Sequence, residues 1–133
     1  METIFFLGRF HPLLVHLPIG FLILAILIEI YCSIFKIRIN QSIINFTWFI
    51  AFFSSVLTTT LGLLIAETGH YIDENLFMHK VFGLSLTAVS FVSWFFRLSF
   101  FSNLFSSSLK TVLNISILFL LTLTGHYGGN LTH

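Results

Sequence analysis

Six histidines carry most of the chemistry that this sequence offers. His11 and His16 lie in the stretch GRFHPLLVHLPIG, residues 8–20, where a long apolar run begins, and His79 lies at the start of another such run. The remaining three are His70, His126 and His133. Histidine is costly in hydrocarbon and usually pairs with another group there, so histidines inside apolar runs indicate a functional site.

The composition predicts a membrane protein. Of the 133 residues, 56% are hydrophobic and only 8% are charged, whereas soluble domains carry about 25% charged residues. We therefore expect one integral membrane domain that covers residues 1–133. Cys32 is the only cysteine, which excludes an internal disulfide and a CxxCH haem attachment. A metal or cofactor would then be held by nitrogen or oxygen ligands.

Four apolar segments approach the length of about 20 residues that a membrane-spanning helix needs. They cover approximately residues 11–35, 43–68, 76–98 and 109–124. The expected fold is all-α, an integral membrane four-helix bundle. Pro18 has no N–H to donate to the carbonyl of Leu14, so we expect the first helix to be interrupted near His16.

The charges between the expected helices predict the orientation, because Lys and Arg concentrate in cytoplasmic loops. Lys36, Arg38, Arg97 and Lys110 flank one side of the bundle, whereas Arg9 and Lys80 flank the other. This distribution places both termini on the periplasmic, outer side. All six histidines fall on the same outer side.

Two pairs of histidines suit haem. Bis-histidine ligation in a helical bundle needs two imidazoles on different helices at similar depth. His16 and His79 each lie about one turn inside helices that run in the same direction, so they form the first expected pair. His11 and His126, which lie nearer the surface, form a second. One or two b-type haems are therefore expected.

Small and polar residues near these histidines match the shape and charge of a porphyrin. Gly20 lies four residues after His16, and Gly83 lies four residues after His79, so each glycine shares a helix face with its histidine. Stripes of small residues also let membrane helices pack closely, which is the alternative reading of both glycines. Haem propionates need cationic or donor partners, and the candidates are Arg9, Lys80, Tyr71 and Tyr127.

Other roles of the histidines are also compatible with the sequence. Imidazoles also suit zinc or copper, which makes His16, His79, His11 and His126 candidate metal ligands. Glu67 and His70 have the E-x-x-H spacing of di-iron bundles, but those bundles use a second such motif and two further glutamates, which this sequence lacks. Each histidine also has a structural reading, as a helix cap or a partner of a carbonyl. His70 and His133 rank last as ligands because they lie in expected loops.

Two polar residues inside the apolar segments need partners. Glu29 lies near the inner end of the first segment, where it either reaches Lys36 or Arg38 or takes part in proton transfer. Asn114 in the fourth segment is expected to hydrogen-bond a neighbouring helix.

Three stretches resemble one membrane protein family, the DUF2231 domain family. GRFHPLLVHLPIGFL resembles the N-terminal signature of the family, and NLFMHKVFG resembles its L-x-x-H-[RK]-x-x-G segment. The final TGHYGGNLTH resembles the G-H-x-G-G-x-L-x-H segment of members attached to c-type cytochrome domains in planctomycete- and Bacteroidetes-type bacteria. The three matches occur in the family order and span nearly the whole chain.

The resemblance marks five histidines and implies a redox role. The marked residues are His11, His16, His79, His126 and His133, whereas the position of His70 is usually small or polar in the family. Association with cytochrome c modules implies membrane electron transfer. Because this sequence has no CxxCH motif, a c-type haem that exchanges electrons with it is expected on a partner chain.

The sequence therefore predicts a b-type haem-binding subunit of a bacterial inner-membrane redox complex, with its histidine-rich side facing the periplasm. Electrons would pass from a membrane donor such as quinol, which makes quinone a candidate second ligand, to a periplasmic cytochrome c or copper acceptor. No nucleophile and base are arranged as in a stand-alone enzyme. Two alternatives are a structural or assembly subunit and a zinc- or copper-binding membrane protein.

Overall fold

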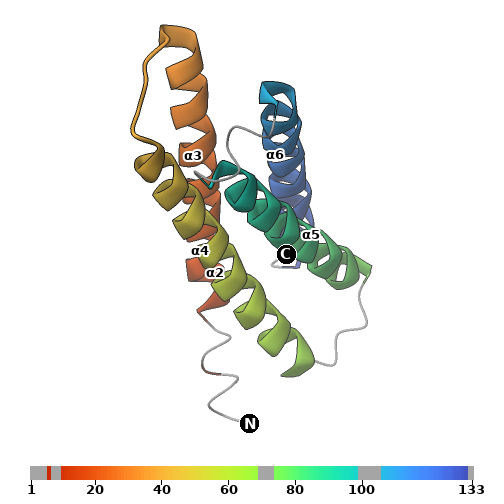
Figure 1. The fold of residues 1–133 in the computed structure, drawn as a ribbon. Helices are drawn as coiled ribbons and strands as arrows, with labels where there is room; N and C mark the ends of the chain where they lie inside the picture. The colour runs from red at the N-terminus through yellow and green to blue at the C-terminus, as the bar shows by residue number, and fades with distance from the viewer. Residues whose placement is uncertain (1–5, 7–9, 69–73, 99–105, 132–133) are drawn as a thin grey trace.

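The computed structural model is all-helical over the residues that it describes, which are 6, 10–68, 74–98 and 106–131 (Figure 1). The helices are α2 (His11–Leu14), α3 (His16–Phe35), α4 (Gln41–Thr68), α5 (Glu74–Arg97) and α6 (Ser107–Asn130). With α2 and α3 forming one span, the described residues contain four helices that are long and apolar enough to cross a membrane. The expected all-α membrane fold is confirmed.

The helices follow one another antiparallel, so the start of α2, the end of α4, the start of α5 and the end of α6 lie at one end of the molecule (Figure 1). The pairs α3–α4, α4–α5 and α5–α6 pack along their lengths, whereas α3 and α6 make few contacts. The apolar core consists of Leu22, Ala25, Ile26, Trp48, Ala51, Leu86 and Ile117. The bundle is therefore closed on three sides and less so between α3 and α6.

The first span is interrupted at Val15, one residue before the position where Pro18 led us to expect it. The carbonyl of Leu14, which Pro18 cannot reach with an N–H, accepts a hydrogen bond from the hydroxyl of Thr58 in α4 (3.2 Å). The freed backbone acceptor is thus satisfied by a neighbouring helix, as a bilayer interior requires.

The fourth helix is longer than the sequence predicts. It continues to Asn130 instead of ending near residue 124, although its last turns contain Gly125, Gly128 and Gly129, which are poor helix formers. The physical reason is tertiary packing: the side chain of His79 in α5 contacts this glycine-rich end. Packing against a neighbour outweighs intrinsic propensity here.

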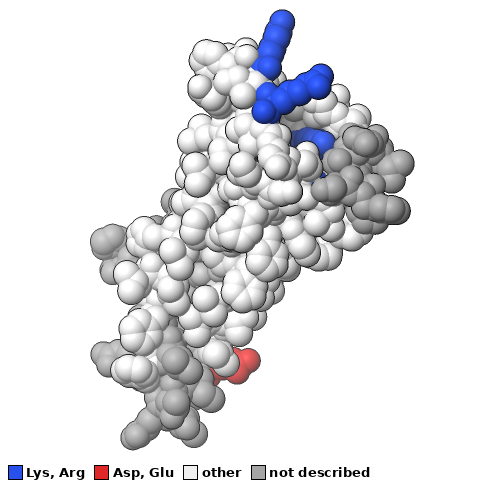
Figure 2. Space-filling view, turned by 60° about the vertical axis from the view of Figure 1, so that its left-hand side comes forward, with Lys and Arg blue, Asp and Glu red and all other residues white. Residues whose placement is uncertain are grey.

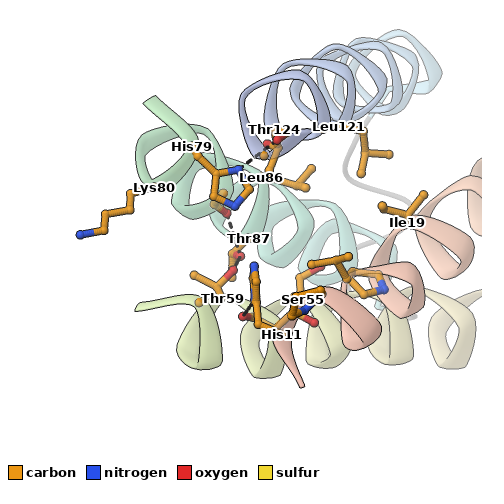
Figure 3. Close-up of a pocket in the computed structure, with 18 of the residues that line it drawn as sticks. His11, Ile19, Ser55, Thr59, His79, Lys80, Leu86, Thr87, Leu121 and Thr124 are labelled. Atoms are coloured by element: carbon orange, nitrogen blue, oxygen red, sulfur yellow. Dashed lines mark hydrogen bonds between the residues drawn. The ribbon is translucent and has the colours of Figure 1, made fainter. Parts of the chain in front are cut away.

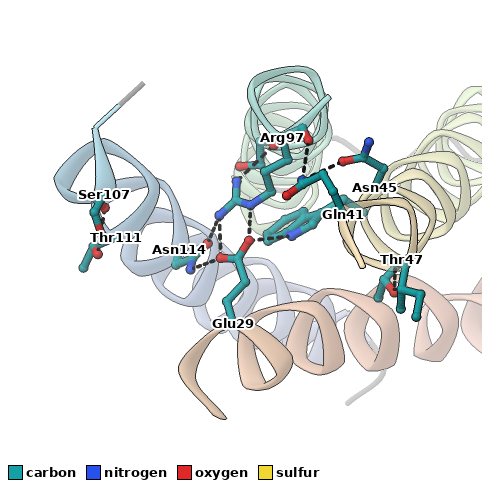
Figure 4. A network of polar contacts seen from close by, with 11 residues as sticks. Glu29, Gln41, Asn45, Thr47, Arg97, Ser107, Thr111 and Asn114 are labelled. Carbon is teal, nitrogen blue, oxygen red and sulfur yellow. Dashed lines mark hydrogen bonds and ion pairs between the residues drawn. The ribbon is translucent and has the colours of Figure 1, made fainter. Parts of the chain in front are cut away.

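A cluster of four polar side chains, one from each span, joins the helices near the opposite end (Figure 4). We call Glu29, Trp48, Arg97 and Asn114 the polar cluster. The Oε1 of Glu29 accepts hydrogen bonds from Arg97 Nε and Trp48 Nε1, the latter at 3.1 Å. Its Oε2 accepts from Arg97 Nη2 (2.8 Å) and Asn114 Nδ2 (2.9 Å).

The guanidinium of Arg97 is held on several sides. It forms a two-pronged ion pair with Glu29, donates to Asn114 Oδ1 at 2.7 Å and lies 4.0 Å from the ring centroid of Trp48. Forked carboxylate pairs and contacts with an aromatic face both suit arginine. The polar cluster therefore satisfies a buried charge entirely within the protein.

These contacts overturn two expectations and confirm a third. Glu29 pairs with Arg97 instead of reaching Lys36 or Arg38, and Arg97 is a buried residue of the bundle, only 1% exposed, rather than a loop cation. Lys36 and Arg38 are exposed. On the face that Figure 2 shows, Lys and Arg gather at one end and acidic side chains lie near the other. Asn114 makes the expected interhelical hydrogen bonds.

We predict that reversing one charge of the polar cluster destabilises the bundle and that reversing both restores it. Glu29→Arg or Arg97→Glu buries two like charges, and losing a buried pair costs about 3–5 kcal/mol. The double variant E29R/R97E regains an ion pair between the same two helices. Thermal unfolding in detergent, followed by circular dichroism, measures all three. Arg38→Met, at an exposed position, is the control and should leave the unfolding temperature unchanged.

Candidate functional site

A cleft of about 620 Å³ lies between the helices at the end that carries the histidines (Figure 3). This volume falls within the range of about 300–1,000 Å³ that is typical of small-molecule and cofactor sites. Its walls are mostly apolar or small side chains, and its polar groups include His11, His16, His79 and Lys80. Three of the six histidines of the sequence therefore line one cleft.

The ring of His11 is fixed by α4. Its Nδ1 hydrogen-bonds to the carbonyl oxygen of Thr58 at 2.9 Å, and the ring lies against the backbone of Gly62, one turn further along α4. A Cβ atom at Gly62 would lie 2.7 Å from His11 Cε1, closer than two carbon atoms pack. Gly62 thus allows the imidazole to approach the helix.

The ring of His79 is fixed by α6 in the same way. Its Nδ1 hydrogen-bonds to the carbonyl oxygen of Thr124 at 3.0 Å. A Cβ atom at Gly128 would lie 2.8 Å from His79 Cε1, so this position also needs a residue without a side chain. Each imidazole therefore has the same two supports, a threonine carbonyl and the glycine four residues later.

These hydrogen bonds determine which ring nitrogen is available. A carbonyl oxygen only accepts, so Nδ1 of each ring carries the proton and Nε2 keeps its lone pair. The two rings point toward one another across the cleft (Figure 3). Their centroids are 6.1 Å apart and their planes are nearly perpendicular, at 83°. The site thus presents two nitrogen lone pairs, one from His11 and one from His79.

The matching supports reflect a wider equivalence between two halves of the chain. Position n of α2–α3 corresponds to position n + 68 of α5, which relates His11 to His79 and Glu29 to Arg97. Position n of α4 corresponds to n + 66 of α6. Further corresponding pairs are Pro18 and Leu86, Leu22 and Ser90, Ala25 and Ser93, Trp48 and Asn114, Ala51 and Ile117, Thr58 and Thr124, and Gly62 and Gly128.

Corresponding residues of the two halves make contacts with one another. The two histidines meet at one end of the bundle, and the four members of the polar cluster, which form two corresponding pairs, meet at the other. Such repeats with the same direction across the membrane are related by an axis along the membrane normal. The cleft and its two imidazoles therefore lie between two quasi-equivalent halves.

The histidines are paired differently in the structure than the sequence predicts. The ring next to His79 is that of His11, not His16. His16 lines the cleft, and its Nδ1 contacts the carbonyl of Leu13 in its own helix at 3.3 Å. His126 is exposed, with its ring against Tyr127 at 5.3 Å between centroids. The structure thus brings together one member of each expected pair.

The other expected site residues occupy different places. Gly83 and Lys80 line the cleft, and Lys80 extends away from its centre (Figure 3). Gly20 is not among the residues that line it, and a Cβ atom at Gly20 would have no atom within 4 Å. Four further residues that the sequence suggested for the site, Arg9, His70, Tyr71 and His133, lie outside the described residues.

The sequence analysis did not identify the groups that orient the two imidazoles. Thr58 and Thr124 act through backbone carbonyls, and Gly62 and Gly128 act through a missing side chain, so neither type of residue looks reactive. A signal exists in the spacing, because both helices contain T-x-x-x-G. Aligning the two halves on His11 and His79 would have placed these motifs opposite the two imidazoles.

The fold and the cleft define a small helical membrane protein with a paired-histidine site between its halves. The chain belongs to the family described as predicted membrane protein (DUF2231), which it matches over residues 9–133. The suspected family is thereby confirmed. No curated protein and no solved structure matches the chain.

We predict that a methyl group at either supporting glycine displaces only the histidine that rests on it. Gly62→Ala should disturb His11, and Gly128→Ala should disturb His79, because the new Cβ would lie 2.7 Å or 2.8 Å from the ring. Nitrogen NMR of protein with ¹⁵N-labelled histidine reports the tautomer and environment of each ring. The wild type should show protonated Nδ1 at both. Gly20→Ala is the control, and equal changes in all three variants would contradict the proposed contacts.

Proposed function

We propose that this protein binds one b-type haem between His11 and His79 and transfers electrons as a subunit of a membrane redox complex. The observation that carries the proposal is the opposed pair of imidazoles. Each directs Nε2 into the cleft while Nδ1 bonds a backbone carbonyl. Histidines that ligate metals almost always donate their other ring N–H to a carbonyl or carboxylate.

The separation of the rings supports ligation. A bond from a metal to an imidazole nitrogen is about 2 Å long and the ring centre lies about 1 Å further on, so two rings on opposite sides of one metal have centres about 6 Å apart. The centroids of His11 and His79 are 6.1 Å apart. Aromatic rings in simple contact reach similar distances, so the absorption spectra of the variants described below distinguish the two cases.

The number of ligands favours haem over a bare metal ion. Zinc takes four ligands in a structural site and three protein ligands in a catalytic one. Among the described residues no group of three His, Cys, Asp or Glu side chains is placed to hold a metal. Haem iron receives four nitrogens from the porphyrin, so two histidines complete its coordination. The pair His11 and His79 is therefore sufficient for haem.

The shape of the cleft also suits a flat plate. A haem held by His11 and His79 would lie in the seam between the two halves. On one side the seam is closed by the hydroxyls of Thr59 and Thr87, which hydrogen-bond at 2.8 Å. On the other side α3 and α6 make few contacts, and the cleft is lined by Ile19 and Gly125. The seam between the halves is therefore closed on one side and open on the other.

Haem would supply reversible one-electron chemistry, and the protein would supply orientation and a low-dielectric setting. The cationic end of the molecule, with exposed Lys36 and Arg38, supports a cytoplasmic position for that end. The His11–His79 pair would then lie toward the periplasm of a bacterial inner membrane. This position suits transfer from a membrane donor such as quinol to a periplasmic cytochrome c or copper acceptor.

Purified protein should contain about one iron per chain and show a Soret band with split α and β bands. His11→Ala and His79→Ala should each lose most of the Soret absorbance, because each removes one of the two histidines that would hold the haem. His126→Ala, at an exposed position outside the cleft, is the matched control and should keep the spectrum. Absorption spectroscopy and elemental analysis of the four proteins measure these outcomes.

The same measurements distinguish the alternatives. Copper or zinc in place of iron, lost in both His11→Ala and His79→Ala, would identify a bare metal site. Protein without iron, copper or zinc would indicate a structural or assembly subunit. Retention of the haem spectrum in His11→Ala together with its loss in His16→Ala would return the pairing to His16 and His79.

A further inference from the structure

Two departures from the equivalence of the halves occur at the same place, the boundary between α3 and α6. If the two halves were identical, the contact between α4 and α5 would recur as a contact between α6 and α3. At the first boundary Thr59 and Thr87 join their hydroxyls. The corresponding residues at the second boundary are Gly125 and Ile19, which have no hydroxyl to share.

The boundary between α3 and α6 is open at this level. Ile19 is 38% exposed, and a Cβ atom at Gly125 would have no atom within 4 Å. Both residues line the cleft, as does Leu121, and Figure 3 shows Ile19 and Leu121 on either side of this boundary. The cleft therefore has a lateral opening, framed by Ile19, Leu121 and Gly125.

By length and composition, the two helices that frame this opening are candidate membrane spans. Ile19 and Gly125 both lie within the membrane spans, His11–Phe35 and Ser107–Asn130. Ile19 is eight positions after His11, which corresponds to about 12 Å along a helix that rises 1.5 Å per residue. A molecule that reaches the opening from outside the bundle must therefore be soluble in lipid.

The second departure is His16. The corresponding residue of the other half is Leu84, so an imidazole occurs beside the open boundary and an apolar residue beside the closed one. Nδ1 of His16 contacts the Leu13 carbonyl at 3.3 Å, which leaves Nε2 as a hydrogen-bond acceptor. His16 is exposed and lines the cleft three residues before Ile19.

We propose that the lateral opening binds the head group of an isoprenoid quinol, with a quinol O–H donating a hydrogen bond to Nε2 of His16. The ligand must be lipid-soluble, must carry a polar O–H donor and must fit between apolar residues, and a quinol has all three properties. This inference rests on the proposed function only for the electron acceptor, because binding at the opening itself requires no haem.

The test is equilibrium binding of decylubiquinol, a short-chain quinol, to purified protein kept under reducing conditions and studied by calorimetry. His16→Leu copies the residue of the other half and should weaken binding about tenfold, the effect of one lost hydrogen bond. Ile19→Trp fills the opening and should weaken binding at least tenfold. Ile23→Trp is the matched control, because Ile23 lies one turn deeper on the same helix, is also 38% exposed and does not line the cleft. It should bind like the wild type.

Wild-type binding in both His16→Leu and Ile19→Trp would overturn the quinol site, as would an equal loss in Ile19→Trp and Ile23→Trp. The haem spectrum is recorded for the same samples. If the protein contains haem but does not bind quinol, only the quinol site is contradicted. If the protein lacks haem but binds quinol in a way that depends on His16, the quinol site is supported and only the proposed electron acceptor is contradicted.

Discussion

The constraint on which this structure depends is that a polar group buried between membrane helices must find its partner inside the protein. The charged groups at one end of the bundle and the imidazoles at the other obey it, by different means. At one end the charges of Glu29 and Arg97 meet each other and are enclosed by Trp48 and Asn114. At the other end His11 and His79 bond backbone carbonyls of the neighbouring helix. The polar cluster takes one side chain from each of the four spans. Each imidazole is held by a single pair of helices.

The division of the chain into two quasi-equivalent halves explains why these arrangements are centred. A residue and its counterpart meet near the axis between the halves, so a residue type that is repeated in each half becomes a pair. His11 and His79 are such a pair of like residues. Glu29 and Arg97 are a pair of opposite charges at corresponding positions, which lets the halves attract one another where two identical charges would repel. The two halves are thus held together both by like residues, His11 and His79, and by opposite charges, Glu29 and Arg97.

The two halves differ most at the boundary between α3 and α6. Thr59 and Thr87 close one boundary, and their counterparts Gly125 and Ile19 leave the other open. His16 occurs only in the first half and lies beside the open boundary. The like residues His11 and His79 would hold the proposed haem, whereas the proposed quinol site would use the open boundary.

The sequence by itself determined the membrane class, the four spans and the concentration of histidines toward one end, because hydrocarbon imposes length and polarity on each segment separately. It also marked Pro18 as the cause of an interruption and Asn114 as a partner for another helix. These features depend on local sequence alone. The extension of α6 through Gly125 and Gly128 was not predictable in this way, since intrinsic propensity opposes it and the contact with His79 stabilises it.

Only the tertiary structure decided which residues meet. Depth along a helix suggested His16 with His79, but the direction in which each ring points depends on the neighbouring helix, and Gly62 and Gly128 admit the rings of His11 and His79 instead. Likewise Arg97 counted as a loop cation until the fold placed it beside Glu29, 68 residues away in the chain. Residue types and spacing specify what a side chain needs. The packing of helices specifies which partner supplies it.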